Sequence, residues 1–389
     1  MARFAFLTWD GGGNVPPAVG IAQELVARGH QVGFVGYEVQ RRGIEARGFG
    51  FSALRRSGAY DIYQAPPGPE RLAAMVDNVW VCPDHLEDVP AAIAEHAPTV
   101  LMVDFSMQGA LAAASQADVP TAVLAHSAIA GLVAPPSTPI GAARLSATNA
   151  LRAGAGLPLI SLLDEGWAGL LTLVTTIPDL DPAAAGVAAS VRYVGPIFEH
   201  FPEQVWDSPW SGEDTRPLVL VSFTTTRIWD QRGRIRNTLA ALADQPLRVL
   251  VSGAEPSEIG PLPANATARR FVPHGLVLPW AALTVTHCGH GTVAASLAHG
   301  VPVIGLPNPA ADQPFLAGMV QHLGAGLALD GEAPAEAISA AVQTVLTEPS
   351  YTQVARRLSE VIRAAPGPGG AADELEHLAL TGSAMVHTA

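Results

Sequence analysis

The residues best suited to chemistry lie in one segment of the chain, residues 286–318. A strand is expected to end at His287, and a helix is expected to open at Thr292. Gly289 and Gly291 between them let the backbone approach a ligand closely. Free N–H groups and the positive end of the helix dipole then point at one spot, which is typical of an anion site. His287 adds a donor or a positive charge there, and we expect the anion to be a phosphate.

A carboxylate and an amide follow the next strand of the same segment. That strand is expected over residues 301–307, and Asp312 and Gln313 come after its carboxyl end. Acceptors and donors side by side suit sugar hydroxyls, and ligands of open α/β sheets bind at the carboxyl ends of strands. A phosphate beside a sugar indicates a nucleotide sugar. The alternative is a capping turn followed by a solvated Asp-Gln pair.

The segment resembles the donor signature of the UDP-glycosyltransferase family, which includes the bacterial antibiotic glycosyltransferases. The family pattern begins with H-(G/C)-G-x-G-T, where the second position is Gly or Cys. Six or seven residues later it continues with G-V-P, and it ends with P-x-x-x-D-Q. The positions that agree are His287, Gly289, Gly291, Thr292, Gly300, Val301, Pro302, Asp312 and Gln313, with Pro307 in approximate register. Residues 16–36, 218–226 and 271–289 also resemble the family, so the resemblance spans almost the whole chain.

This resemblance implies a GT-B fold, an α/β architecture of two Rossmann-like parallel-sheet domains that face each other across a cleft. The C-terminal domain would bind the donor and the N-terminal domain the acceptor, and the last helix would cross back. The backbone of Val272 would meet the nucleobase, and Ser222 would face the diphosphate. The helix N-terminus, His287 and His290 would meet the growing charge of the leaving group instead of a cation. The reaction implied is inverting transfer without a metal, with the nucleotide sugar as co-substrate and no other cofactor.

The nucleotide and the acceptor are indicated less directly. Ala295 stands where some relatives have a glutamate for the ribose hydroxyls, which favours a dTDP-linked sugar and leaves a UDP-linked one open. Apolar stretches at 57–83 and 127–143 suit a small hydrophobic natural product such as a polyketide aglycone. Four side chains are assigned to the acceptor pocket: Trp9, Tyr60, Trp80 and His126. The alternative interpretation is ordinary surface loops with scattered core aromatics.

The pair that would activate the acceptor is incomplete. Many family members carry a histidine before the first helix, which deprotonates the acceptor hydroxyl, and a carboxylate that orients it. Asn14 stands at the histidine position and cannot accept a proton, whereas Asp104 fills the carboxylate position. One route uses Asp104 or Asp10 as the base, with a pKa raised by burial. A second relies on an acidic acceptor such as a phenol, and a third on His126 or His290. We favour assistance by Asp104 or by the substrate.

Asn14 also keeps other classes of function open. One is a helper protein that retains the fold and the nucleotide site without catalysis. Another is a nucleotide-sugar epimerase on the same fold. The favoured function is a hexosyltransferase of antibiotic biosynthesis, that is, of secondary metabolism.

Alternating strand and helix patterns predict the elements that position these residues. In the N-terminal half, strands are expected at 3–9, 31–37, 98–106 and 120–128, and helices at 17–30 and 108–117. In the C-terminal half, strands are expected at 217–223, 247–253, 268–273, 283–287, 301–307 and 325–329, and a helix near 231–243. Such repetition implies parallel sheets covered on both faces. The first turn fails the dinucleotide-binding pattern, because Pro16 stands at the third glycine position.

The same patterns suggest the domain boundaries. We expect domains at 1–200 and 217–365, a linker at 201–216 and a final segment at 366–389. In that segment residues 366–370, which are proline and glycine, are expected to break a helix before a short one at 372–380. Asp179 and Asp181 have a spacing that some metal-dependent sugar transferases use, but a solvated acidic turn is the preferred interpretation.

Composition excludes several classes of protein. The 389 residues carry a formal net charge of −13, and all 22 basic side chains are arginine. Binding to nucleic acid, Schiff-base chemistry, a P-loop and a polybasic membrane anchor are therefore disfavoured. Cys82 and Cys288 are too few for a disulfide framework. The sequence has no apolar run of 18 residues and no signal-peptide pattern, so we expect a cytoplasmic protein with no membrane span. A homodimer is possible on this sequence.

Overall fold

The computed structural model describes residues 1–199, 205–223, 229–309 and 312–385. Parts of the expected linker (201–204), of the stretch after the expected strand 217–223 (224–226) and of the donor signature (310–311) lie outside the described residues. Contacts within the chain define two compact units. The N-terminal unit comprises Met1–Glu199 and Pro366–Ala389, and the C-terminal unit comprises His200–Ala365.

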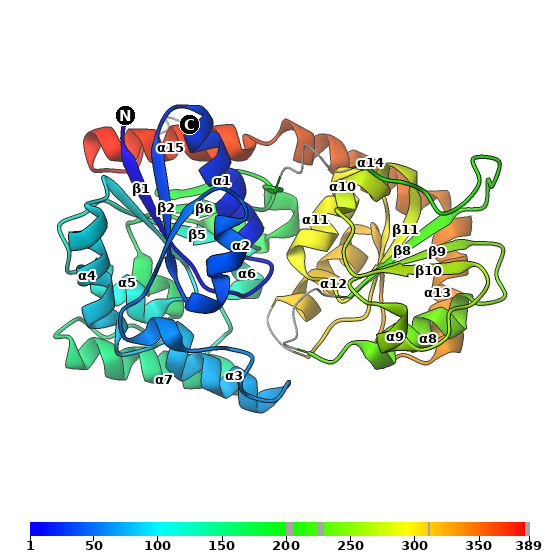
Figure 1. The fold of residues 1–389 in the computed structure, drawn as a ribbon, viewed down its shortest axis with the longest axis horizontal. Helices are drawn as coiled ribbons and strands as arrows, with labels where there is room; N and C mark the ends of the chain where they lie inside the picture. The colour runs from blue at the N-terminus through cyan, green and yellow to red at the C-terminus, as the bar shows by residue number, and fades with distance from the viewer. Residues whose placement is uncertain (200–204, 224–228, 310–311, 386–389) are drawn as a thin grey trace. The chain divides into compact units, whose positions relative to one another are not determined.

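The N-terminal unit is built on a parallel sheet with the strand order β3-β2-β1-β4-β5-β6-β7. Figure 1 labels β1, β2, β5 and β6 of this sheet. Its strands are β1 (Arg3–Leu7), β2 (Gln31–Gly36), β3 (Gly50–Ala53), β4 (Val100–Asp104), β5 (Thr121–Ala125), β6 (Leu171–Val174) and β7 (Val191–Tyr193). Every residue of β4 and β5 is buried, as expected of parallel strands covered on both faces. The chain changes direction across the sheet between β1 and β4, and ligands of open α/β sheets bind at such a switch point.

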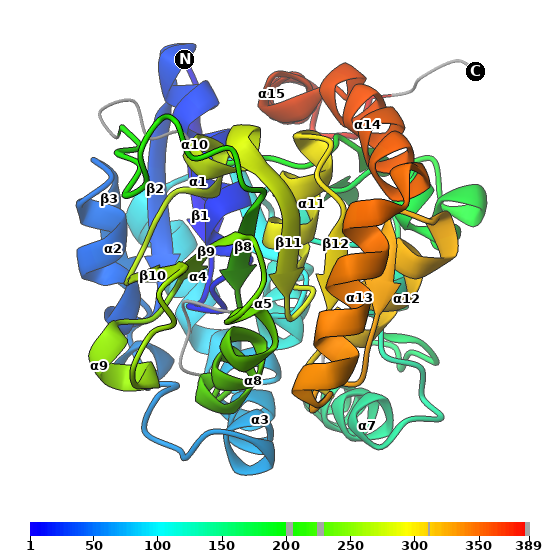
Figure 2. The same ribbon diagram turned by 90° about the vertical axis from the view of Figure 1, so that its right-hand side faces the viewer.

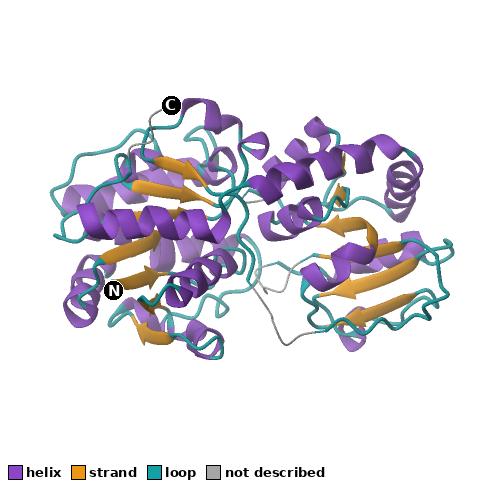
Figure 3. Ribbon diagram, turned by 90° about the horizontal axis from the view of Figure 1, so that it is seen from above, coloured by secondary structure: helices purple, strands orange, loops and turns teal. Residues whose placement is uncertain are grey.

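Helices cover both faces of this sheet, and Figure 3 shows strands between helices in each unit. One face packs against α1 (Val15–Ala27) and α15 (Gly367–Thr381), and the other packs against α4 (His85–His96) and α5 (Gln108–Ala114). The remaining α-helices of the unit are α2 (Arg41–Glu45), α3 (Pro69–Met75), α6 (Ile129–Leu132) and α7 (Pro139–Gly154). The apolar faces of the elements thus form two large clusters, one on each side of the strands, and a smaller one of Val76, Val81, Ala112 and Leu151.

The C-terminal unit repeats this topology with the strand order β10-β9-β8-β11-β12-β13, most of which Figure 2 shows in sequence across the view. Its strands are β8 (Leu218–Ser222), β9 (Arg248–Ser252), β10 (Ala266–Arg269), β11 (Ala281–Thr286), β12 (Val303–Gly305) and β13 (Gly326–Ala328). Its helices are α8 (Arg232–Leu242), α9 (Pro256–Ile259), α10 (His274–Val277), α11 (His290–Ala298), α12 (Gln313–Leu323), α13 (Ala335–Thr347) and α14 (Pro349–Ala364). The switch point of this sheet lies between β8 and β11.

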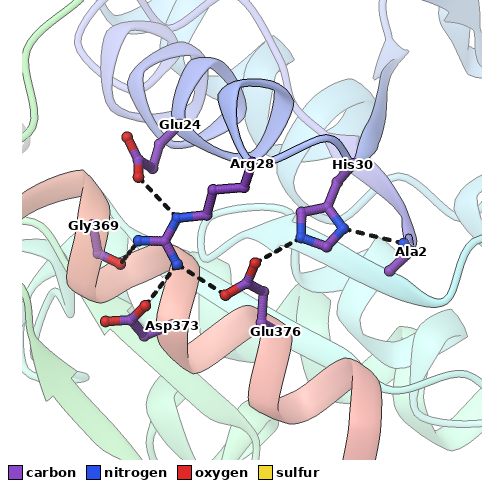
Figure 4. A network of polar contacts seen from close by, with 7 residues as sticks. All are labelled: Ala2, Glu24, Arg28, His30, Gly369, Asp373 and Glu376. Carbon is purple, nitrogen blue, oxygen red and sulfur yellow. Dashed lines mark hydrogen bonds and ion pairs between the residues drawn. The ribbon is translucent and has the colours of Figure 1, made fainter.

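Polar contacts attach α15 to the N-terminal unit beside α1 (Figure 4). The guanidinium of Arg28 donates to Asp373 at 2.6 Å and to Glu376 at 2.8 Å. His30 lies 2.6 Å from Glu376 through Nε2, and its Nδ1 accepts from Ala2 N. Hydrogen bonding to His30 lowers the pKa of Glu376, and bonding to Arg28 adds to this effect. The last helix therefore belongs structurally to the N-terminal unit, although it follows the C-terminal unit in sequence.

Each predicted strand is present, and its predicted ends lie within four residues of the observed ends. Strands β3, β6 and β7 were not predicted. The predicted helix break at 366–370 is present but shorter, because α14 ends at Ala364 and α15 starts at Gly367 and not at the predicted residue 372. Proline is tolerated in a first helical turn, where the missing N–H has no partner in any case. No helix in the described part of the chain is long and apolar enough to span a membrane.

The solvated acidic turn predicted at Asp179 and Asp181 is confirmed for Asp179, which is exposed, and is wrong for Asp181. This side chain is only 1 % exposed. Its carboxylate accepts from the backbone N–H of Ile129 at 2.6 Å and from the hydroxyl of Tyr193 at 2.7 Å. Asp181 therefore ties the start of α6 to β7, and no group of three or more potential metal ligands occurs among the described residues.

Candidate active site

The carboxyl edge of the C-terminal sheet brings the predicted donor residues together. Strand register places Ser222 beside Thr286 and Thr286 beside Gly305, at the ends of β8, β11 and β12. The turn that follows β11 contains His287, so this histidine lies next to the switch point. The position is the one that sheet topology favours for a ligand.

Close packing within that turn explains two residues of the signature. A Cβ on Gly289 would lie 2.6 Å from His287 Nε2, so only glycine lets the backbone lie against the imidazole. Cys288 has a φ of 61°, in the left-handed region that non-glycine residues rarely adopt. Its Sγ fills the space where a Cβ on Gly305 would stand. The turn is thus built around the ring of His287.

Helix α11 starts at His290, two residues before the predicted start, with Gly289 as its N-cap. The N–H groups of Thr292 and Val293 already bond to the carbonyl of Gly289. The N–H groups of His290 and Gly291 come before the first intrahelical bonds and so can point at an anion. The start of α11 therefore lies at the switch point, where the anion site is predicted.

Two histidines border this site in neutral form. His274, which sequence reasoning missed as a site residue, contacts Ser222 Oγ through Nε2 at 3.1 Å. Loss of hydration lowers the pKa of His274 to about 4 and that of His287 to about 3, where the charge of Arg234 adds to the effect. Both rings keep some exposed surface. Of the two alternatives left open for His287, the structure favours a neutral donor over a positive charge.

The side chains expected to bind the sugar and the backbone group expected to bind the nucleobase have some of their polar atoms engaged within the protein. Gln313 Oε1 accepts from Asn308 N at 3.1 Å and from Asn308 Nδ2 at 2.9 Å. Among the described residues its amide N–H groups have no partner and so remain for a ligand. Asp312 is the N-cap of α12, beside Gln313. Val272 N donates to Ser252 Oγ, so its carbonyl is the backbone group left for a nucleobase.

A buried polar network behind Gln313 was not predicted. Asn308 Oδ1 accepts from Gln231 Nε2 at 3.2 Å and also from Arg234. Arg234 in turn donates to the carbonyl of Gly331 at 2.6 Å. These residues lie far apart in the sequence. Only Asn308, next to the signature proline Pro307, stands at a position that could have marked it as a site residue. The network holds the Gln313 carboxamide in one orientation.

A second constellation lies at the switch point of the N-terminal sheet, around Asp104. This carboxylate ends β4 and is 1 % exposed. Its Oδ1 accepts from Ser106 N at 2.9 Å and from the Ser106 hydroxyl. Its Oδ2 accepts from Asn14 Nδ2 at 3.0 Å. The expected pairing of positions 14 and 104 is therefore present, with an amide in place of an imidazole.

His126 approaches the same carboxylate from the next strand. Its Nδ1 lies 3.3 Å from Asp104 Oδ2, an ion-pair distance without the alignment of a good hydrogen bond, and its side chain is 16 % exposed. Burial raises the pKa of Asp104, but contacts with His126 and Ser106 outweigh it, and the net pKa is lowered. The expectation that burial makes Asp104 a base with a raised pKa is therefore wrong. The pKa of Asp10 is raised, chiefly by burial, and Asp10 accepts from Tyr63 at 3.0 Å.

The predicted acceptor aromatics adjoin this constellation. Trp9 Nε1 donates to Ser106 Oγ at 2.7 Å, and the ring meets Trp80 edge to face at 5.9 Å. Trp80 lies at the end of a π-helical turn, Val76–Trp80, and not in a loop. Tyr60 packs against the same apolar cluster as Trp9. Trp9, Trp80 and Asp104 thus form one continuous region.

One cation of this region was missed by the sequence analysis. Arg144 on α7 is 6 % exposed, and its guanidinium lies 4.9 Å over the Trp80 ring. Burial lowers its pKa to about 10, although the charge of Asp104 opposes this effect. Within the described residues, its Nε and Nη2 have no hydrogen-bond partner. A positive charge therefore lies close to the Asp104 carboxylate.

Comparison with known proteins identifies the family. Residues 236–378 match the family described as erythromycin biosynthesis protein CIII-like, C-terminal domain. The chain is 32 % identical to demethyllactenocin mycarosyltransferase of Streptomyces fradiae over 416 aligned positions, which cover 97 % of this chain and 87 % of that protein. The chain belongs to the antibiotic glycosyltransferase family.

Other relatives agree with this assignment. The glycosyltransferase is 28 % identical to 4'-demethylrebeccamycin synthase of Lentzea aerocolonigenes, over 97 % of this chain and 99 % of that protein. Its fold is similar to the crystal structure of the calicheamicin glycosyltransferase, with a TM-score of 0.77, 24 % identity and coverage of 97 % and 98 %. The predicted GT-B fold and the predicted glycosyltransferase class are confirmed.

Proposed function

We propose that this glycosyltransferase moves a hexose or deoxyhexose from a dTDP- or UDP-linked donor to a hydrophobic natural-product aglycone, with inversion and without a metal. The observation that carries the proposal is the turn after β11, which brings His287 and the start of α11 to the switch point, where we expect the donor diphosphate to bind. Solved relatives include a spinosyn rhamnosyltransferase complexed with thymidine diphosphate, and the same enzyme complexed with spinosyn aglycone.

The donor half of the reaction needs stabilisation of the leaving diphosphate. Backbone N–H groups of His290 and Gly291 and a neutral imidazole donor at His287 meet the charge that grows on the departing oxygen. These fixed dipoles can supply the role that a cation plays in other transferases. Gln313 donates and Asp312 accepts hydrogen bonds with the sugar hydroxyls.

The nucleoside preference follows from the inner side of α11. Ala295 is buried and gives no carboxylate to the ribose hydroxyls. A 2′-deoxyribose has only the 3′ hydroxyl and so depends less on the missing contact than a ribose does, and therefore we expect dTDP to be preferred over UDP.

Inversion follows from a single displacement at the anomeric carbon. A double displacement needs an enzyme nucleophile with a free oxygen. In Asp104 both carboxylate oxygens already contact Asn14, Ser106 and His126. Asp104 is therefore unsuited to be that nucleophile, and we infer direct attack by the acceptor oxygen.

Two substitutions test the donor site. His287→Ala removes a donor to the diphosphate and should lower turnover about a hundredfold, the usual effect of losing one such donor. Asp312→Ala should reduce transfer sharply as well, while circular dichroism shows a folded chain. His322→Ala, at an exposed position of α12, is the control. Unaltered turnover in both site variants, or no heat of binding with either dTDP or UDP, would contradict the proposal.

A further inference from the structure

Strand register creates an acid–base pair in the N-terminal unit. Asp104, the last residue of β4, pairs with Leu124 of β5, and His126 follows two residues later. Side chains two residues apart in an extended segment point to the same side. This places the imidazole of His126 against the carboxylate of Asp104, with Nδ1 3.3 Å from Oδ2. The pair sits beside the switch point of the sheet.

We propose that His126 is the general base of sugar transfer and that Asp104 positions it, in place of the histidine that position 14 lacks. This inference rests on the proposed function and names a catalytic residue for it. Asn14 and His126 approach the same oxygen, Asp104 Oδ2. Of the two, only the imidazole can accept a proton near neutral pH.

The proton balance of the step follows from the geometry. Asp104 faces Nδ1 and so favours the tautomer that carries its proton there, which leaves the lone pair on Nε2. Nε2 takes the proton of the acceptor hydroxyl while the oxygen forms its bond to the anomeric carbon. The bond from that carbon to the diphosphate oxygen breaks, and its electron pair leaves with the nucleoside diphosphate. The imidazolium, held beside the Asp104 carboxylate, later releases its proton to water.

The other candidates are less suited to this step. Both oxygens of Asp104 are already engaged in contacts with Asn14 and Ser106, so neither is available to take a proton from a substrate hydroxyl. Asp10 accepts from Tyr63 and makes no ion pair among the described residues. His85 is fully buried against the hydroxyl of Tyr37 at 3.0 Å. His126 combines a carboxylate partner with a side chain that is 16 % exposed.

The charges around His126 suit a base that cycles between neutral and positive forms. Asp104 on β4 is the carboxylate within ion-pair distance of its ring. Arg144 on α7 is the next charge, close enough to interact with Asp104. Phe105 packs against the ring at 5.2 Å and limits its rotation. The ring is thus oriented on one side by a charge and on another by an aromatic contact.

The test exchanges the two side chains that share Asp104. His126→Asn keeps an N–H donor for Asp104 but removes the basic nitrogen. With an acceptor that carries a secondary alcohol, such as a macrolide aglycone, kcat should fall at least about a hundredfold, the lower end of the effect of general bases. In the native enzyme, protonation of the base should lower kcat at acid pH, and this acid limb of the pH profile should disappear in the variant. The Kd for dTDP, measured by calorimetry, should stay within twofold of the native value.

The double variant His126→Asn/Asn14→His has the composition of the native chain and places an imidazole at the other position beside Asp104 Oδ2. It should recover at least about tenfold of the lost kcat, with an acid limb, because either position lets Asp104 orient the ring. His96→Asn, at the end of α4 in the same unit, is the control for the substitution itself.

The outcomes separate this inference from the proposed function. If His126→Asn transfers sugar to the alcohol within threefold of the native kcat and keeps the acid limb, the inference is overturned while the proposed function stands. If the native protein binds neither dTDP nor UDP, the proposed function fails and takes the inference with it.

Discussion

The histidines at the candidate sites of the two units lie in opposite surroundings. In the C-terminal unit, His274 and His287 have no carboxylate at ion-pair distance among the described residues, and loss of hydration lowers their pKa to about 4 and about 3. In the N-terminal unit, His126 lies 3.3 Å from the buried carboxylate of Asp104. The same side chain thus meets an uncharged setting in one unit and a negative one in the other.

This difference assigns different work to the same residue type. Dehydration without a counter-charge keeps an imidazole neutral, so it can donate a hydrogen bond to a diphosphate but does not cycle a proton easily. A carboxylate partner stabilises the imidazolium that forms when a hydroxyl is deprotonated. Donor binding and proton transfer are therefore separable by substitution.

The largest expected effect comes from displacing His287, the histidine of the C-terminal unit in this comparison. Gly289→Ala adds a Cβ that would lie 2.6 Å from His287 Nε2, so the imidazole must move off its position. The backbone there, with φ −63° and ψ 138°, is one that alanine accepts, so the damage is steric and local. We expect the Kd for dTDP to rise about a hundredfold, equal to about 2.7 kcal/mol.

Gly318→Ala is the matched control for that substitution. It lies on α12, where a new Cβ meets nothing within 4 Å. In a helix interior the change should stabilise the fold by about 0.5–1 kcal/mol and leave the Kd unchanged. Equal Kd values for the two alanine variants and the native chain would show that His287 takes no part in nucleotide binding.

Acid should weaken the C-terminal unit more than the N-terminal unit. His274 and His287 have pKa values of about 4 and 3 in the folded chain, below the ordinary value near 6.5 of an unfolded histidine. The unfolded chain therefore binds these protons first, and stability falls as the pH drops from about 6.5 toward 4. Between pH 7 and pH 5 each histidine contributes a loss of up to about 2 kcal/mol, reduced by the solvent that reaches both rings.

Calorimetric unfolding at the two pH values measures this loss. His85, whose pKa is about 4, is the corresponding histidine of the N-terminal unit, so that unit should lose about half as much. His274→Gln should flatten the pH dependence of the C-terminal transition and leave that of the N-terminal transition unchanged. A pH dependence that His274→Gln does not alter would contradict the neutral state assigned to His274.

Local sequence predicted much of the C-terminal site and less of the N-terminal one. The strand that ends near His287, the glycine turn and the following helix form one continuous segment, so their chemistry was visible in the order of the residues. The contact between Asp104 and His126 depends on β4 and β5 being neighbours in register, and that information lies in the sheet and not in either segment.

The missed residues share a physical reason. Arg144, Arg234 and Asp181 act through buried contacts with segments distant in sequence, and a lone charged residue looks like any surface position until it is packed. The prediction of a solvated turn at Asp181 followed the usual exposure of aspartate. The prediction failed because three backbone N–H groups, from Ile129, Ala130 and Ala183, needed an acceptor there.

The smallest expected effect on catalysis tests the amide that accompanies the pair. Asn14 Nδ2 donates to Trp9 O at 2.9 Å and to Asp104 at 3.0 Å, so Asn14→Ala leaves a buried carbonyl and a buried carboxylate each with one donor fewer. We expect a stability loss of about 1–3 kcal/mol by thermal unfolding. With Asp104 less firmly held, kcat should fall about tenfold, and the acid limb of the pH profile should remain because His126 is still present. If Asn14→Ala loses the acid limb, proton removal depends on position 14 and His126 is not the base. Asn14→His, which restores a polar partner for Asp104, should preserve or raise transfer to alcohols.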